Sequence, residues 1–454
     1  MTDEQLQELH HTLPEQTIAE AATSTLRNKR NGLQSNAMGA DLLKAHVALL
    51  EKEILLSKHG DIFRLVQHHY RRLQAWHDQY TGWRIQRTST LIRLVRHSST
   101  ATQGYQYERL RDAKDFACLT WILWYAENRQ LSGRGNDQQF LLSQLADQIQ
   151  EQSSQGEEEG TTLDFRRQTD RYSIQRALHY LGDLGGLQLV DGQTREWVDQ
   201  TGNVDVLYEF TDVARSLVAA LDAGAVAESA AQLHPLQPGL LPMAQSVPAL
   251  MRAWRSLLLG PALFAFDDSE AFAVLRTHAE TVATELLDTF GWLLEIQRNY
   301  ACIIRPLGSA TGPTTTLTIY GTLDQIVLLL CAALRERLHT APWATPDQYG
   351  CLHLTNEDMN ELFFAVRERF GDNWGNDARS RGSSSLLNDV SRKMRQLGML
   401  RGPDENGNIL ILPLAARFSA SYEKPEQQTP TTGRTRSRAR AKTARPTPAL
   451  PGME

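Results

Sequence analysis

The stretch "QRALHYLGDLGGLQLVDG", from Gln175 to Gly192, decides the fold class of this chain. Apolar residues at helical spacing stop at a pair of glycines, a short apolar strand follows, and the chain turns at Asp191 and Gly192. Glycine supplies the left-handed backbone conformation that ends many helices, so Gly185 and Gly186 predict a sharp exit. The stretch therefore predicts a helix that is followed directly by a strand.

The surrounding sequence supplies the other elements of the same unit. Amphipathic patterns predict helices over 41–58, 61–80, 112–131, 136–152 and 171–184, with Asn136 or Asp137 as an N-cap, and a strand pair over 81–96. Strands "GLQLV" and "VLYEF" enclose the charged loop "DGQTREWVDQTGNVD" before the helix "TDVARSLVAAL". The order helix, helix, helix, strand, loop, strand is typical of a winged helix-turn-helix.

The same order recurs after residue 247, which predicts an internal repeat of about 200 residues. Trp83 of "YTGWRI" corresponds to Trp292 of "TFGWLLEI", and "LGGL" corresponds to "LGML". "SSSLLNDVSRKMRQLGML" supplies a third helix, with Leu386, Val390, Met394 and Leu397 on its inner face. We expect a mainly α fold with small β-hairpins, built from tandem winged-helix domains.

The expected boundaries follow changes in composition. They are a polar N-terminal extension over 1–36, a first winged-helix unit over 37–222, an Ala- and Pro-rich linker over 223–247, a second unit over 248–422, and a disordered basic tail over 423–454. Composition also favours a cytoplasmic protein. None of the four cysteines lies in a CxxC pair, no signal peptide is evident, and the longest apolar run, "IVLLLCAAL", is too short to span a bilayer. We expect no membrane partner.

Motifs for catalysis are missing from the sequence. There is no Gly-Lys dipeptide for a phosphate-binding loop, no HExxH and no GxSxG. The histidine pairs His10–His11 and His68–His69, and nearby His77, lack metal-ligand spacing, so we interpret them as solvent-facing. We expect no enzyme activity, no cofactor and no metal site.

Nucleic-acid contact must come from local patches, because the formal net charge is −6. The best candidate is the third helix of the second unit, where arginines and serines at the N-terminus would meet a phosphate and basic residues would face outward. The candidate residues are Arg379, Arg381, Ser383, Ser384, Arg392, Lys393 and Arg395. A solvated charged face with a serine cap is an equally good interpretation. Replacing the five basic residues by Ala is expected to leave the fold intact and to weaken DNA binding.

Two further basic segments are weaker candidates. In the first unit, Arg171, Arg176 and His179 are expected on the exposed side of the third helix, but Asp170 and Asp183 flank them. The tail residues Arg434, Arg436, Arg438 and Arg440 would attract a nucleic-acid backbone without reading its sequence, or would only increase solubility.

Long stretches of the chain resemble a known family. The pieces "YTGWRI", "FACLTWILWYAE", "LLSQLADQI", "SIQRALHYLGDLGGLQLVDG" and "LYEFTDVARSLVAAL" are similar to the KITE subunit of Wadjet-type plasmid-defence complexes, over roughly residues 41–422. The resemblance implies a tandem winged-helix protein that forms a homodimer, binds a kleisin, and lies beside DNA held by an SMC ATPase. It also implies association with the nucleoid or with plasmids, and support of DNA loop extrusion and plasmid restriction.

Two other functions stay open on the residues alone. A site-specific DNA-binding protein, such as a plasmid replication initiator, can also be built from two winged helices. An enzyme with an unrecognised site is the third alternative. Weak DNA binding with little sequence preference would favour the architectural subunit, whereas a protected palindrome or repeat array would favour the initiator.

Overall fold

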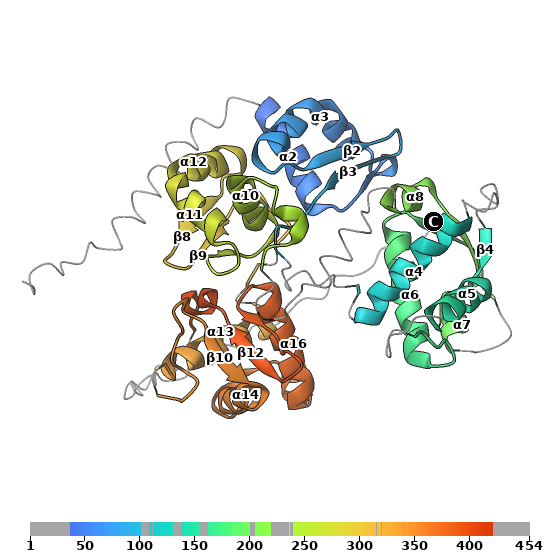
Figure 1. Ribbon diagram of the computed structural model, residues 1–454. Helices are drawn as coiled ribbons and strands as arrows, with labels where there is room; N and C mark the ends of the chain where they lie inside the picture. The colour runs from blue at the N-terminus through green and yellow to red at the C-terminus, as the bar shows by residue number, and fades with distance from the viewer. Residues whose placement is uncertain are drawn as a thin grey trace, which may run out of the picture.

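The computed structural model describes residues 37–100, 109–110, 112–129, 139–154, 162–199, 205–218, 236, 239–314, 316–318, 320–338 and 340–420. Over these residues the chain is mainly helical, with four antiparallel sheets of three short strands each (Figure 1). Each sheet belongs to one group of helices, and we call the four groups modules 1 to 4. The predicted extension over 1–36 and the predicted tail over 423–454 lie outside the described residues.

Each predicted unit contains two modules. Module 1 consists of α2 (Ala37–Glu51), β1 (Leu55–Leu56), η3 (Ser57–His59), α3 (Asp61–Tyr80), β2 (Arg84–Arg87) and β3 (Leu91–Val95). Module 2 consists of α4 (Ala113–Arg129), β4 (Gln139–Leu141), α5 (Leu142–Ser154), α6 (Gln168–Asp183), β5 (Leu187–Asp191), α7 (Thr194–Asp199), β6 (Leu207–Phe210) and α8 (Asp212–Val218).

The second predicted unit is divided in the same way, after the short η5 (Pro242–Ala244). Module 3 consists of α10 (Ala249–Leu259), β7 (Leu263–Phe264), α11 (Ser269–Thr277), α12 (Ala279–Phe290), β8 (Leu293–Ile296) and β9 (Tyr300–Ile304). Module 4 consists of α13 (Thr322–Glu336), β10 (Leu352–Thr355), α14 (Asn356–Phe370), η6 (Gly371–Asn373), α15 (Asn376–Ser380), α16 (Ser383–Gln396), β11 (Leu400–Arg401), β12 (Asn408–Ile411) and η7 (Pro413–Arg417).

All four sheets share one topology. The first strand of each module pairs with its third strand, which pairs with its second: the orders are β1-β3-β2, β4-β6-β5, β7-β9-β8 and β10-β12-β11. With a helix before the first strand and helices between the first and second strands, this is the connectivity of a winged helix. The common element order agrees with the predicted repeat, while a duplicated sequence stays a prediction.

The abrupt helix end in the opening stretch occurs in every module. The helix before the second strand is followed by a glycine with positive φ, and these are Gly82 (64°), Gly185 (78°), Gly291 (72°) and Gly398 (66°). A Cβ on Gly185 would lie 2.5 Å from Leu56 Cδ1, and one on Gly398 would lie 2.3 Å from Pro261 Cγ. The ends of α6 and α16 therefore press closely against the module that precedes each of them.

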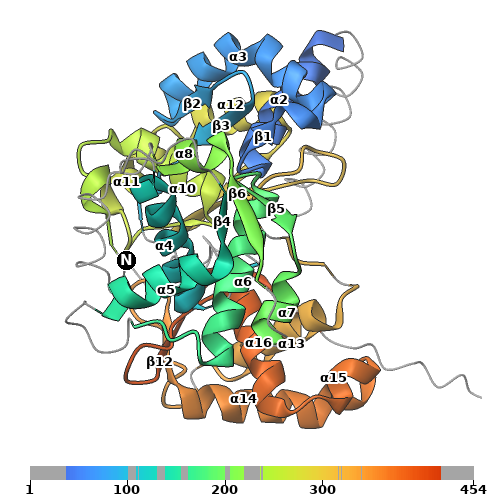
Figure 2. The same cartoon turned by 90° about the vertical axis from the view of Figure 1, so that its right-hand side faces the viewer.

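Modules 1 and 3 share one hydrophobic core. Leu49, Leu73 and Trp83 from module 1 belong to the same buried cluster as Trp254 and Phe290 from module 3. The ring of Trp76 meets the rings of Trp254 and Phe290, with centroids 5.6 and 5.7 Å apart. Figures 1 and 2 show the two modules side by side, and the shared core explains why they form one body.

Polar contacts join the same two modules. Trp76 Nε1 donates to Glu285 Oε1 at 2.7 Å, and Arg255 Nε donates to the Thr81 carbonyl at 2.6 Å. The predicted counterparts Trp83 and Trp292 are both fully buried, and each indole donates to a backbone carbonyl, of His97 and of Ala310. The two tryptophans therefore play the same structural role in modules 1 and 3.

Modules 2 and 4 have their own cores and attach differently to the shared body. Module 4 joins module 3 through a buried cluster that includes Phe264, Tyr300, Leu410 and Leu412. At this joint Arg401 forms a buried bidentate ion pair with Asp267, at 2.8 and 2.5 Å. Module 2 joins module 1 through a smaller cluster of Ile54, Leu56, Leu91 and Val213.

Several predicted boundaries were wrong for one physical reason. The first strand of each module has only two to four residues and pairs with a strand that is distant in sequence. The helix predicted over 41–58 therefore ends at Glu51 and is followed by β1, and the helix predicted over 136–152 begins at Leu142 after β4. The proposed caps Asn136 and Asp137 lie outside the described residues. The charged loop of the first unit contains α7.

Candidate nucleic-acid interface

The third helix of module 4, α16, has the predicted inner face. Leu386, Val390, Met394 and Leu397 are all buried, which confirms the helical periodicity. At the N-terminus, Arg367 from α14 donates to Ser383 Oγ at 2.8 Å and to the carbonyls of Arg379 and Arg381 at 3.1 and 2.9 Å. The Ser383 hydroxyl is thus already engaged by an arginine, whereas the Ser384 side chain is exposed.

The charge of the outward arginines is largely compensated. Arg381 and Arg392 both bind Asp389, at 2.7 and 2.8 Å, and Arg381 also approaches Asp377 at 3.9 Å. Arg379 is exposed and donates to the side chain of Asn376. Because Asp389 neutralises part of this surface, the predicted site carries little excess positive charge.

Lys393 and Arg395 do not face outward, so that part of the prediction was wrong. Lys393 Nζ lies 3.2 Å from Asp324 Oδ1 of α13, and both side chains are largely buried. Arg395 donates to the Gly402 carbonyl at 2.8 Å, and burial lowers the pKa of its guanidinium. These two side chains hold α16 against its own module, and replacing them is expected to affect the fold.

The corresponding prediction for α6 was also wrong for two of three residues. Arg171 is buried and donates to the carbonyls of Val198, Phe165 and Arg166. Arg176 binds the fully buried Asp115 at 2.7 Å and Asp112 at 3.3 Å. His179 is exposed, as predicted.

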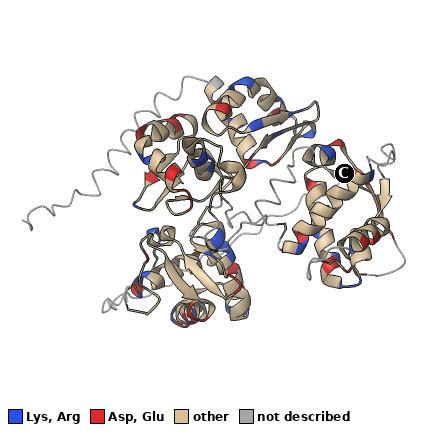
Figure 3. Cartoon of the chain, viewed as in Figure 1, with Lys and Arg blue, Asp and Glu red and all other residues tan. Residues whose placement is uncertain are grey.

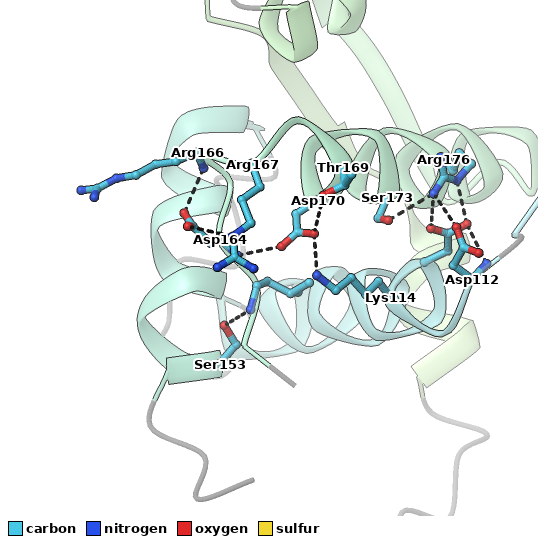
Figure 4. A network of polar contacts seen from close by, with 12 residues as sticks. Asp112, Lys114, Ser153, Asp164, Arg166, Arg167, Thr169, Asp170, Ser173 and Arg176 are labelled. Atoms are coloured by element: carbon cyan, nitrogen blue, oxygen red, sulfur yellow. Dashed lines mark hydrogen bonds and ion pairs between the residues drawn. The ribbon is translucent and has the colours of Figure 1, made fainter. Parts of the chain in front are cut away.

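A polar network fixes α6 to α4 (Figure 4). Asp170 is fully buried and accepts from Lys114 at 2.6 Å, from the backbone of Asp164 at 3.1 Å and from Thr169 at 3.2 Å. Burial alone would raise the pKa of Asp170, but the bond from Lys114 and the other donors outweigh it, and the pKa is lowered. Asp170, Arg171 and Arg176 of α6 therefore stabilise module 2, and their polar groups are engaged within it.

The histidines differ from their predicted placement. His68 is exposed, whereas His69 and His77 are buried, because α3 turns both toward the protein interior. His10 and His11 lie outside the described residues, as do the tail residues Arg434, Arg436, Arg438 and Arg440. All four cysteines are free and buried, and burial raises the pKa of the Cys118 thiol to about 12.

A basic surface that the sequence reasoning missed lies on module 1. Arg71 and Arg72 are exposed on α3, and Arg84 and Arg87 are exposed on the neighbouring strand β2. Gln74 of α3 joins the helix to this strand: its Nε2 donates to the Trp83 carbonyl at 3.2 Å, and its Oε1 accepts from Ile85 N at 2.8 Å. The adjacent pair Arg71 and Arg72 is the signal in the sequence that could have indicated this surface.

Other kinds of site find no support in the described part of the chain. No group of three or more His, Cys, Asp or Glu side chains within it could hold a metal ion. None of the described helices combines the length and the apolar character needed to cross a bilayer.

Comparison with known proteins identifies a family. No curated protein matches the chain, and no solved structure matches it. The model of the family described as "Protein of unknown function (DUF2398)" matches residues 47–421, from α2 to the end of module 4. This match spans most of the 454 residues and all four modules. The chain therefore belongs to the DUF2398 family.

Proposed function

We propose that this chain is a non-catalytic architectural subunit of an SMC-type complex, in which it binds the kleisin and contacts DNA. In this role it supports DNA loop extrusion and restriction of plasmid DNA in bacterial defence. The observation that carries the proposal is the fourfold winged-helix connectivity, with two modules fused through one core. Winged helices serve both as DNA-binding and as protein-binding units, and a fused pair gives them a fixed spacing.

Exposed apolar residues on module 2 support the binding of a protein partner. Leu189 and Val190 on β5 are 53% and 45% exposed, and Leu141 on β4 of the same sheet is 36% exposed. Large apolar side chains left exposed on one small sheet are available for contact with a protein partner. We assign this sheet to the kleisin.

Homodimerisation is a further element of the proposal. The surface that joins modules 1 and 3 is already buried within one chain. A homodimer would therefore contain eight modules and would have to use another surface. Light scattering on the purified protein would give twice the mass of one chain if this element holds.

Co-expression tests the proposal directly. The full chain is produced with a candidate kleisin and a candidate SMC ATPase, and the complex is isolated through a tag on the kleisin. A stable stoichiometric complex is expected, and Leu189→Ser/Val190→Ser is expected to release this subunit. Tyr320→Ser, which changes another strongly exposed residue, is the matched control. Failure of the wild-type chain to join either protein would end the proposal.

A further inference from the structure

We infer that module 1 binds the phosphate backbone of duplex DNA through α3 and β2, with Arg71, Arg72, Arg84 and Arg87 as the contacts. The inference rests on the DNA contact of the proposed function and moves it from α16, where the sequence placed it, to module 1. In winged helices the third helix and the adjoining hairpin are the elements that approach a duplex. In module 1 these are α3 and the β2–β3 hairpin.

α3 and β2, which carry the four arginines, are held side by side. Gln74 holds α3 against the free edge of β2 with two hydrogen bonds. Arg87 reaches from β2 across to α3, where its guanidinium lies 4.5 Å from the centroid of the Tyr70 ring. Stacking on a ring leaves the N–H groups in the guanidinium plane free to donate to phosphate oxygens.

These arginines are not neutralised by acidic neighbours. Across the described residues, Arg71, Arg72, Arg84 and Arg87 form no ion pair, whereas Arg381, just before α16, and Arg392, on α16, share Asp389. From α3 through β2 the chain has five arginines against two aspartates, and one of those aspartates, Asp61, pairs with Arg64. Free guanidinium groups at the surface are what counterion release from DNA requires.

Module 3 provides an internal comparison. Its corresponding segment, from α12 through β8, carries Glu280, Glu285, Asp288 and Glu295 and has no lysine or arginine. Figure 3 shows the contrast, with blue residues along α3 and β2 of module 1 and red residues on α12 of module 3. Two modules with the same topology therefore have opposite charge on the same elements, which favours a polyanion at module 1 over module 3.

The surface is also held rigidly. Behind the arginines, Leu73 and Trp83 are fully buried in the core shared with module 3. Rigid placement reduces the entropy that is lost when side chains contact a ligand. Duplex DNA is favoured over an acidic polypeptide because all four contacts are arginines, whose planar fork matches phosphate, on the helix and hairpin that fit a duplex.

Fluorescence anisotropy with a labelled duplex of mixed sequence tests the inference on the full chain. The test variant is Arg71→Gln/Arg72→Gln/Arg84→Gln/Arg87→Gln, which keeps much of each side-chain stem. Because the slope of log K against log salt falls by about 0.9 per lost phosphate contact, four contacts predict a slope smaller by about 3.6. When the salt concentration rises from about 50 to about 200 mM, the DNA affinity of both proteins falls. The fall for the wild-type protein should be about 150-fold larger than the fall for the variant.

Two further variants separate the possible outcomes. Arg379→Gln/Arg392→Gln, at α15 and α16 respectively, is the matched control, which we call the α16 variant, and it is expected to bind almost like the wild type. Arg71→Gln/Arg72→Gln changes α3 alone; it should lower the slope by about 1.8 and serves if the fourfold variant does not fold.

Loss of binding in the α16 variant with retention in the α3 variants would overturn the inference and keep the DNA contact at α16. Wild-type-like binding by all variants would overturn it and assign DNA contact elsewhere in the chain. A wild-type protein that binds polyglutamate but not the duplex would overturn both the inference and the DNA contact of the proposed function.

Discussion

Acid is expected to weaken the joint between modules 1 and 3 through His46. This residue of module 1 is 3% exposed. Its ring centroid lies 4.6 Å from that of Trp76 in the same module and 4.7 Å from that of Phe290 in module 3. Its Nε2 has no hydrogen-bond partner. Burial lowers the pKa of His46 from 6.5 to about 3, so the folded protein holds a neutral imidazole at every pH above that value.

The direction of the effect follows from proton binding. Below pH 6.5 the unfolded chain binds a proton at His46 and the folded chain does not, so stability falls as the pH decreases from 6.5 toward 3. Above pH 6.5 both states are neutral at this position and the contribution disappears. At pH 5 the loss of unfolding free energy amounts to about 2 kcal/mol, since each pH unit below 6.5 costs about 1.36 kcal/mol.

Urea unfolding at about pH 7.5 and about pH 5 measures this loss, with tryptophan fluorescence as the signal, because Trp76, Trp83, Trp254 and Trp292 all belong to this region. The variant His46→Leu removes the titrating group and should reduce the loss between the two pH values by about 2 kcal/mol. His68→Leu, at an exposed position in the same module, is the control and should keep the wild-type pH dependence. Equal pH dependence in wild type and His46→Leu would refute the reasoning.

Three further predictions concern stability and share thermal and urea unfolding as the measurement. Gly398→Ala should cost more than about 2 kcal/mol, because φ is 66° and the new Cβ would meet Pro261, whereas Gly371→Ala in the same module should be near neutral. Asp267→Asn should cost about 3–5 kcal/mol by leaving Arg401 buried and unpaired, and Asp267→Leu/Arg401→Met should recover part of that loss; an equal loss in both would contradict the ion-pair explanation. Lys393→Ala should lower the melting temperature by leaving the carboxylate of Asp324 without its cation, whereas Arg392→Ala should not; the reverse order would show that the inward placement of Lys393 is wrong.

Local signals made part of the fold predictable. The helix predicted over 61–80 matches α3 at both ends, because the residues that mark its ends are adjacent to it in sequence. Gly60 precedes the helix, and Thr81 and Gly82 follow it. The strand pair over 81–96 was found for the same reason, since β2 and β3 are neighbours in the chain and pair through a short turn. The fold class, mainly helical with small antiparallel sheets, followed from such elements.

Features that depend on distant contacts were not predictable. β1 and β4 are short and become strands only by pairing with β3 and β6, so each predicted unit was read as one winged helix where there are two. In the candidate site, helical spacing placed Lys393 on the outer face, but it could not show that Asp324 of α13 lies beside it. The same limit hid the core that modules 1 and 3 share, because its two halves are separated by about 200 residues.

The fusion of modules 1 and 3 in one chain frees them from the constraint of self-complementarity. Two identical subunits that meet about a twofold axis must present the same residues, so any arginine on one side appears on the other. Here the two modules have separate sequences, and module 1 is cationic on the elements where module 3 is anionic. The body formed by modules 1 and 3 is therefore asymmetric in charge, and a polyanion that binds to it is expected on the module 1 side only.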